Sequence, residues 1–288
     1  MSEDAAPGTT NPLILVEQYQ LLSSEFELRT NSLELQADVR AMAPRAQQHI
    51  PVRHHYVLTA RTAEDEFRIG EEGGVEDFEL TAFYAARNLV SRMHQRALTN
   101  LPDHVSLRAA IGMRAGRAFL LAGAKGAGKT TLALRLMFEG YDIAGDDRTL
   151  LQGGKAVAFP WKFLVSDSSL ELVPQLQAVH GAAPVNALPG YDYRFATDPV
   201  TFGRPWHIAP AEVGTILFLE PNFGTRTEII RTGKIDMARL LIPTCAPPPS
   251  RRAGWLGDLS RTIDSAETFV VQLGDLDTAV VALKRIPL

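Results

Sequence analysis

The strongest constraint on how this chain can fold is one glycine-rich run, Gly123-Ala124-Lys125-Gly126-Ala127-Gly128-Lys129-Thr130. Its spacing is G-x-x-x-x-G-K-[ST], in which the glycines allow backbone conformations that are closed to other residues. Residues 117–122 before it are mostly apolar and predict a strand, while residues 131–137 after it predict a helix. A strand, a tight loop and a helix in this order require an α/β fold, in which a sheet is combined with helices.

Each fixed position of this loop has a role in holding phosphate. The loop amides converge on phosphate oxygens, and the following helix adds the positive end of its dipole. Lys129 reaches the β- and γ-phosphates, Thr130 offers its hydroxyl to Mg²⁺, and Thr131 contacts the α-phosphate. The sequence therefore predicts a site for ATP and Mg²⁺ at Gly123, Ala124, Lys125, Gly126, Ala127, Gly128, Lys129, Thr130 and Thr131.

Two alternatives to a phosphate loop are a flexible glycine turn and a dinucleotide fingerprint. The flexible turn is disfavoured because a strand and a helix flank the run. The fingerprint G-x-G-x-x-G fails because Thr131 stands where a glycine would have to follow Gly128.

A pair of adjacent carboxylates, Asp146 and Asp147, follows the helix at the end of a short predicted strand, residues 141–145. A helix followed directly by a strand brings both carboxylates to the sheet edge that carries the phosphates. Mg²⁺ prefers carboxylate oxygen, and a kinase needs a carboxylate to take the proton of the acceptor hydroxyl. The alternative is a solvated turn before the predicted hairpin of residues 148–159.

The segment from the loop to these carboxylates, GAKGAGKTTLALRLMFEGYDIAGDDRTLL, resembles the bacterial HPr serine kinase family and its relatives in peptide-modification gene clusters, including lasso peptide kinases. The likeness covers residues 105–165 and continues more loosely at residues 215–220 and 273–275. It implies a P-loop mixed sheet of the HPr kinase and PEP carboxykinase type, flanked by helices. It also implies that Asp146 is the general base and that Asp147 is a Mg²⁺ ligand.

The chain departs from this family at two points. Where the family usually carries a histidine facing the phosphates, this chain has Arg108, which can hold phosphate by charge but does not shuttle a proton at neutral pH. His104 is no substitute, because four strand residues separate it from Arg108 by about 13 Å. The glycine-rich signature segment of the family's reverse reaction has no counterpart, so neither that reaction nor the family's hexamer is implied.

Composition excludes several classes of partner. The chain has 288 residues and a formal net charge of -4, so it has no broad positive field to gather nucleic acid or an anionic membrane surface. Its longest apolar run near the N-terminus, residues 13–16, is too short to span a bilayer. The single cysteine, Cys245, predicts a reducing, cytoplasmic setting, and no histidine shows metal-ligand spacing.

The sequence pattern divides the chain into a smaller and a larger region. Residues 1–12 predict a disordered start without an export signal. Residues 13–102 predict an N-terminal α+β region, in which a small antiparallel sheet is closed by an amphipathic helix from Leu80 to Arg96. Residues 103–288 predict the nucleotide-binding kinase domain. We expect the N-terminal region either to present the acceptor or to mediate assembly of a homo-oligomer.

The sequence pattern of the larger region predicts a series of strands and helices around the loop. Residues 178–211 are rich in Pro, Gly and aromatics and predict a long loop, which is typical of a lid or a binding loop. The other predicted elements are a hairpin of residues 105–111 and 118–122, strands at residues 215–220, 227–230 and 269–273, and helices at residues 129–139, 234–241 and 276–285.

Four further residues are candidates for phosphate or acceptor contacts: Arg108, Lys162, Glu220 and Arg204. Lys162 follows the second hairpin, where relatives tend to carry a basic residue, but it also fits an ordinary surface lysine. Glu220 ends a strand expected beside the loop strand, and it also fits a simple strand-end acid. Residues of the long loop suit acceptor recognition or could clamp the loop to the body. Besides Arg204, this loop carries Tyr191, Tyr193, Arg194 and Trp206.

Together these features predict a kinase that uses ATP and Mg²⁺ to phosphorylate a hydroxyl group, Ser or Thr, of a protein or peptide acceptor. Its catalytic residues would be Lys129, Asp146 and Asp147, and its metal ligands Thr130 and Asp147. One alternative is a kinase for a small-molecule acceptor such as a sugar, a polyol or another alcohol. A second alternative, which Arg108 favours, is a nucleotide-binding regulatory protein without transfer activity.

Overall fold

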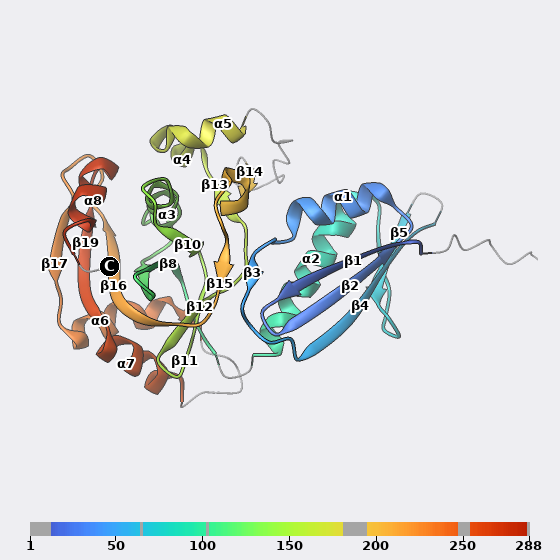
Figure 1. Ribbon diagram of the computed structural model, residues 1–288, viewed down its shortest axis with the longest axis horizontal. Helices are drawn as coiled ribbons and strands as arrows, with labels where there is room; N and C mark the ends of the chain where they lie inside the picture. The colour runs from blue at the N-terminus through green and yellow to red at the C-terminus, as the bar shows by residue number, and fades with distance from the viewer. Residues whose placement is uncertain (1–12, 64–65, 102–103, 181–194, 247–253, 287–288) are drawn as a thin grey trace, which may run out of the picture. The chain divides into compact units, whose positions relative to one another are not determined.

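The computed structural model describes residues 13–63, 66–101, 104–180, 195–246 and 254–286, and the expected disordered start, residues 1–12, lies outside these described residues. The chain divides into two compact units. The smaller unit comprises residues 1–44 and 51–100, and the larger unit comprises residues 45–50 and 101–288. Each unit combines helices with a mixed sheet, which agrees with the predicted α/β class (Figure 1).

The smaller unit holds a five-stranded sheet in the order β1-β2-β4-β5-β6. The prediction of an antiparallel sheet here is wrong, because β2 and β4 are parallel. Helix α1 lies between them in the sequence, and such a crossover returns the chain to the end of the sheet where the previous strand began. The elements are β1 (Leu15–Leu21), β2 (Ser24–Thr30), α1 (Leu33–Met42), β4 (His54–Ala63), β5 (Glu66–Glu71), β6 (Asp77–Glu79) and α2 (Ala82–Thr99).

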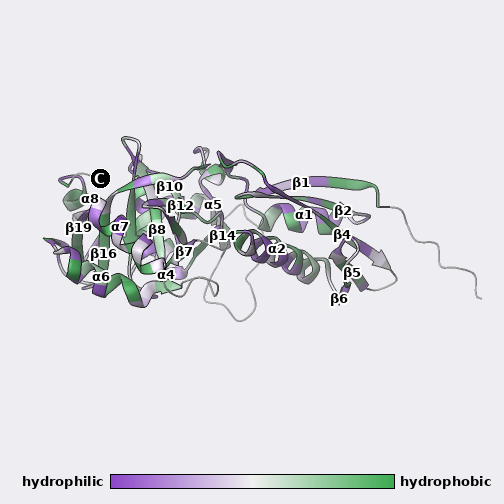
Figure 2. Ribbon diagram, turned by 90° about the horizontal axis from the view of Figure 1, so that it is seen from below, coloured by the Kyte–Doolittle hydropathy of each residue, from purple (hydrophilic) through white to green (hydrophobic). Residues whose placement is uncertain are grey.

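Helix α2 is the long amphipathic helix that the sequence predicts at the end of this region. It begins after Thr81, whose hydroxyl accepts the N–H of Tyr84 at 3.2 Å and so satisfies one of the free donors of the first turn. Leu89 and Met93, four residues apart, are buried on one side of the helix. Figure 2 shows α2 as a mixture of hydrophilic and hydrophobic residues, as an amphipathic helix requires.

The larger unit is built on a ten-stranded sheet. Its main path is β10-β8-β9-β16-β12-β11-β7-β18, while β19 pairs with β16 and β17 pairs with β19 (Figure 1). The strands are β7 (Val105–Leu107), β8 (Ala109–Arg114), β9 (Arg117–Ala122), β10 (Asp142–Gly145), β11 (Thr149–Gln152), β12 (Lys155–Ala158), β16 (Ala211–Pro221), β17 (Glu228–Arg231), β18 (Cys245–Ala246) and β19 (Glu267–Leu273).

Strand β16 connects the two halves of this sheet. Its first residues pair antiparallel with β12, and the rest of the strand runs parallel to β9 and β19. Leu217 and its neighbour Leu121 on β9 join Phe119 in the main hydrophobic core, while Ile216 and Leu120 are buried without belonging to that cluster. Because successive side chains point to opposite faces, the central strands are buried on both sides, as in sheets covered by helices on both faces.

The apolar run of residues 105–111 forms two strands rather than the predicted one. Strand β7 pairs with β11 and β18, whereas β8 pairs with β9 and β10. The chain changes partners at Arg108, whose amide donates to the carbonyl oxygen of Thr244 at 2.9 Å. The predicted hairpin is therefore the pair β8 and β9, and Ala115 and Gly116 in its turn both have positive φ, as a tight hairpin requires.

Helices of the larger unit form both where the sequence predicts them and where it does not. Helices α3, α6 and α8 occur at their predicted places, whereas the pattern does not predict α4, α5 or α7. Helix α7 is stabilised by Leu259 and Ile263, which are buried one turn apart. Lys234 of α6 donates to the Ile263 carbonyl at 2.7 Å. The helices are α3 (Lys129–Phe138), α4 (Asp167–Leu172), α5 (Gln177–His180), α6 (Lys234–Leu241), α7 (Trp255–Ser265) and α8 (Leu276–Leu283).

The predicted long loop of residues 178–211 is only partly a loop. Strand β14 pairs with β13, and β15 pairs in parallel with β3. Strands of two or three residues are too short for an alternating pattern to show in the sequence. The elements are β3 (Gln47–Gln48), β13 (Phe163–Val165), β14 (Phe195–Thr197), the 3-10 helix η2 (Pro199–Phe202) and β15 (His207–Ile208).

In the part of the chain that the structure describes, none of the helices is both long enough and apolar enough to cross a membrane.

Candidate functional site

The glycine-rich loop joins β9 to α3 through glycines with positive φ, 153° at Gly123 and 89° at Gly128. A Cβ on Gly128 would lie 2.7 Å from Cδ2 of Leu273. A Cβ on Gly123 would lie 2.9 Å from the carbonyl oxygen of Leu219. Conformation and close packing therefore both require glycine at these two fixed positions of the motif.

The loop leads directly into the N-terminus of α3. Gly128 is the N-cap residue, and no side chain caps this end of the helix. The first N–H groups of a helix have no acceptor within the helix, and the helix dipole makes this end electropositive. The start of α3 therefore presents donors and positive potential of the kind that bind phosphate.

Lys129 folds back over the loop from the first turn of α3. Its Nζ donates to the carbonyl oxygens of Gly123 at 2.9 Å and Ala124 at 2.8 Å, and the residue is only 7% exposed. Burial lowers the pKa of Lys129, while the charge of Asp147 opposes this effect and Arg108 reinforces it. A phosphate reaching this ammonium group would replace two neutral acceptors with charged oxygens, which make stronger hydrogen bonds.

The loop and the carboxylate pair meet in one hydrogen bond, in which Thr130 Oγ1 donates to Asp146 Oδ2 at 2.8 Å. Strand β10 is antiparallel to β8, and β8 is antiparallel to β9. Strands β9 and β10 therefore run in the same direction and end at the same edge of the sheet. A β-bulge at Ala144 interrupts the register of β10 with β8 just before Asp146.

Asp146 is a buried carboxyl group, 4% exposed, at the end of β10. Its pKa is raised to about 7, mainly by burial; the hydrogen bond from Thr130 opposes the rise and the charge of Asp147 adds to it. A carboxyl group with a pKa near neutrality can accept and release a proton, as a general base must.

The raised pKa of Asp146 predicts that stability depends on pH. Between the ordinary pKa of 3.8 and about 7, the folded chain keeps a proton on Asp146 that the unfolded chain has released. Stability therefore falls as the pH rises through this window, by a few kcal/mol, since one pKa unit corresponds to about 1.4 kcal/mol. Urea unfolding at pH 5 and pH 8, without nucleotide or Mg²⁺, should show a larger fall for wild type than for Asp146→Asn. Equal falls in both proteins would contradict this pKa.

Asp147, unlike Asp146, is open to solvent and faces Arg108. The Nε atom of Arg108 lies 3.8 Å from Oδ1 of Asp147, and the two side chains are 49% and 58% exposed. Ion pairs as open as this contribute little to stability. The structure thus brings Arg108, at the junction of β7 and β8, to the carboxylate pair, and a ligand can compete for either partner.

A cluster of hydroxyl groups beside the loop is not apparent from the motif. Thr131 Oγ1 lies 2.7 Å from Ser169 Oγ, which lies 3.1 Å from Ser166 Oγ. Ser166 is the N-cap residue of α4 and accepts the amide of Ser169. A capping pattern in Ser166-Asp167-Ser168-Ser169 is the signal that could have indicated this helix. The Thr131 hydroxyl, expected at the α-phosphate, is thus bonded to the start of α4.

Phe223 is a second residue beside the loop that the motif does not indicate. Its ring lies 3.8 Å from the position that a Cβ on Gly128 would take, and the side chain is 61% exposed. It follows β16, which lies on the opposite side of β9 from β8 and β10. An exposed aromatic ring at the rim of the loop offers a flat apolar face that suits a nucleobase.

The remaining three predicted contact residues, Lys162, Arg204 and Glu220, contact neighbouring elements of the larger unit. Nζ of Lys162 lies 3.6 Å from Oδ2 of Asp198, the N-cap residue of η2, and burial lowers the pKa of Lys162. The amide of Arg204 donates to the carbonyl oxygen of Pro199 in the same short helix. Glu220 lies near the end of β16, opposite β19, and is half-buried. Three predicted loop residues lie outside the described part of the chain: Tyr191, Tyr193 and Arg194.

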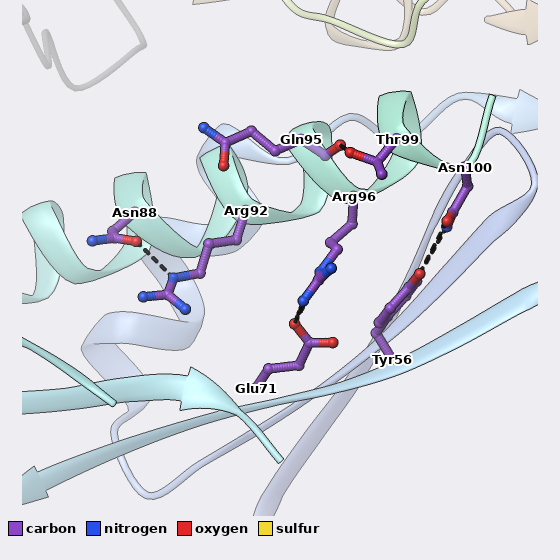
Figure 3. Close-up of polar contacts among 8 residues, drawn as sticks. All are labelled: Tyr56, Glu71, Asn88, Arg92, Gln95, Arg96, Thr99 and Asn100. Carbon is purple, nitrogen blue, oxygen red and sulfur yellow. Dashed lines mark hydrogen bonds and ion pairs between the residues drawn. The ribbon is translucent and has the colours of Figure 1, made fainter. Parts of the chain in front are cut away.

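A groove of about 590 Å³ in the smaller unit is another candidate site, lined by side chains of β5, β6 and α2. Figure 3 shows Arg96 of α2 pointing at Glu71, with Nη2 and Oε2 2.7 Å apart. Arg92, one turn earlier, forms an ion pair with Asp77. These pairs neutralise charge across the groove. The chemistry of phosphate binding is therefore better supported at the glycine-rich loop.

Comparison with known proteins adds no relative from which a role could be transferred. No protein-family model matches the chain, and no curated protein matches its sequence.

Proposed function

We propose that this chain is a kinase that uses ATP and Mg²⁺ to phosphorylate a Ser or Thr hydroxyl of a protein or peptide acceptor. The observation that carries this proposal is the hydrogen bond from Thr130 to Asp146, which joins the glycine-rich loop to a buried carboxylate. The loop alone would suit any protein that binds phosphate. A carboxyl group of raised pKa beside it suits removal of a proton from an acceptor.

In this proposal, Lys129 and the first amides of α3 neutralise charge that develops on the transferred phosphoryl group. Asp146 takes the proton of the acceptor hydroxyl while the acceptor oxygen bonds to the γ-phosphorus. The bond from that phosphorus to the oxygen of the β-phosphate breaks, and ADP leaves. Phe223 provides a face on which the base of the nucleotide can stack.

The oxygen donors at this edge of the sheet fit Mg²⁺, which would neutralise phosphate charge when bound. This cation is usually held by one or two carboxylates, and water and phosphate fill its other positions. Thr130 and Asp147 would hold it, and Asp146 lies beside them through its bond to Thr130. A cage of several protein ligands is not needed, and the described residues contain no group of three or more His, Cys, Asp or Glu side chains suited to a metal.

The family we propose is that of the HPr serine kinase-like proteins, and the fold a P-loop mixed sheet of the HPr kinase and PEP carboxykinase type. Two observations support it: β9, β16 and β19 run parallel beneath the loop, and Asp146-Asp147-Arg148 directly follows β10. The larger unit would then be the kinase domain in the cytoplasm. The smaller unit would present the acceptor or mediate assembly.

A nucleotide-binding regulatory protein is the second candidate, and the ion pair of Arg108 with Asp147 favours it. The guanidinium group stays charged at neutral pH and engages one of the two carboxylates that transfer would need. Such a protein would bind ATP and transfer nothing.

Mass spectrometry after incubation with Mg-ATP tests this proposal. We expect phosphate on Ser or Thr of a peptide or protein from an acceptor library, and none when Asp146→Asn is used. Phosphate on a metabolite, with peptides unmodified, would indicate the small-molecule kinase. Binding of ATP without transfer to either pool would indicate the regulatory protein. Failure to bind ATP would contradict all three functions.

A further inference from the structure

At the bulge near the end of β10, one backbone carbonyl group forms a hydrogen bond with a side chain. Ile143 pairs with Gly112 and Gly145 with Ile111, so Ala144 between them has no partner on β8. Its carbonyl oxygen instead accepts the indole N–H of Trp206 at 2.8 Å. Strand β10 is the last strand on this side of the sheet path, and the indole supplies a donor to a carbonyl group of this edge strand.

This hydrogen bond is buried and lies two residues before Asp146. Trp206 is 1% exposed, and its ring packs edge-on against Phe163, with the ring centres 6.2 Å apart. A buried carbonyl oxygen that loses its hydrogen-bond donor raises the free energy of the folded state, unless the backbone moves so that the oxygen finds another donor. A shift of the bulge would also move Asp146, and it would disturb the hydrogen bond that Asp146 accepts from Thr130.

Trp206 is in turn held by a segment from far earlier in the chain. The amide of Gln47 donates to the carbonyl oxygen of Trp206 at 2.8 Å. Next to it, β15 pairs in parallel with β3, and the amide of His49 donates to the carbonyl oxygen of Ile208 at 2.9 Å. Residues 45–50 therefore form a strap within the larger unit that fixes Trp206 by its backbone.

We propose that Trp206 is a positioning residue for Asp146: its indole N–H fixes the bulge at Ala144, and the strap of residues 45–50 fixes Trp206. The placement of Asp146 follows from the structure alone. Its consequence for phosphoryl transfer rests on the function proposed above.

Amide hydrogen exchange of the full chain, measured without nucleotide, tests the positioning directly. Trp206→Phe keeps an aromatic ring against Phe163 but removes the N–H donor together with part of the buried ring, and Trp255→Phe in α7 is a control for the same substitution at a less buried position. We expect residues 144–148 to exchange about tenfold faster in Trp206→Phe, which corresponds to ~1.4 kcal/mol, and to be unchanged in the control. Unchanged exchange in this segment, or an equal rise throughout the larger unit, would overturn the proposal.

Two further measurements make the result specific. Gln47→Pro removes the backbone N–H that donates to the Trp206 carbonyl oxygen. Residues 144–148 should therefore also exchange faster in this variant, by a smaller factor than in Trp206→Phe. This variant tests the proposal even if Trp206→Phe does not fold. In addition, Trp206→Phe should slow phosphoryl transfer about tenfold at saturating Mg-ATP, while the affinity for ATP stays within about threefold of wild type. A loss of affinity with an unchanged transfer rate would contradict a role through Asp146. If wild type binds no ATP, the proposed function fails, and the exchange result still decides the positioning.

Discussion

Replacing Lys129 with Met is expected to weaken the binding of Mg-ATP by about 100-fold. The ammonium group is the buried charge of the loop, and hydrogen bonds to charged groups are each worth roughly 1.5–3 kcal/mol. Met keeps the unbranched shape of the side chain as far as Cε and has no group that can donate a hydrogen bond. Isothermal titration calorimetry of both proteins measures the loss.

Lys155→Met is the matched control for this change, because Lys155 lies at the exposed start of β12. We expect its affinity for Mg-ATP to stay within about threefold of wild type, in line with the small effects of surface changes. If Lys129→Met folds normally and binds Mg-ATP as tightly as wild type, the glycine-rich loop is not the nucleotide site.

Replacing Asp146 with Asn should reduce phosphoryl transfer by about 100- to 10,000-fold, the usual contribution of a general base. The amide oxygen can still accept the hydroxyl of Thr130, so the loop should keep its shape and ATP should bind within a few-fold of wild type. Single-turnover kinetics with saturating Mg-ATP separate the transfer step from binding.

The control for this second change is Asp142→Asn, at the exposed first residue of the same strand. It makes the same Asp-to-Asn replacement outside the site and should leave transfer unchanged. Transfer near the wild-type rate in Asp146→Asn, with binding intact, would show that Asp146 is not the base.

The parts of the site that the sequence predicts are those encoded by neighbouring residues. The loop, its strand and its helix follow from one short motif, and helix α6 has its predicted bounds because its buried residues recur at helical spacing. The position of Asp146 at the loop also follows, since a helix and a strand of ordinary length bring the chain back to the same sheet edge.

The parts that the sequence does not predict depend on distant partners. Ser169 meets Thr131, and Trp206 meets Ala144, only after strands far apart in the sequence have paired. The parallel pairing of β2 and β4 is also invisible in an alternating pattern, which is the same for either strand direction. The change of partners at Arg108 leaves no signal, because both halves of the run are apolar.

The pairing of β16 with β9 has a consequence for synthesis of the chain. Gly123 packs against the backbone of Leu219, so the floor beneath the glycine-rich loop is translated nearly a hundred residues after the loop itself. A nascent chain that ends before β16 has the whole glycine-rich motif but not the strand that shapes it. In the proposed function, nucleotide would therefore stabilise this protein only late in its synthesis, after β16 has emerged and paired with β9.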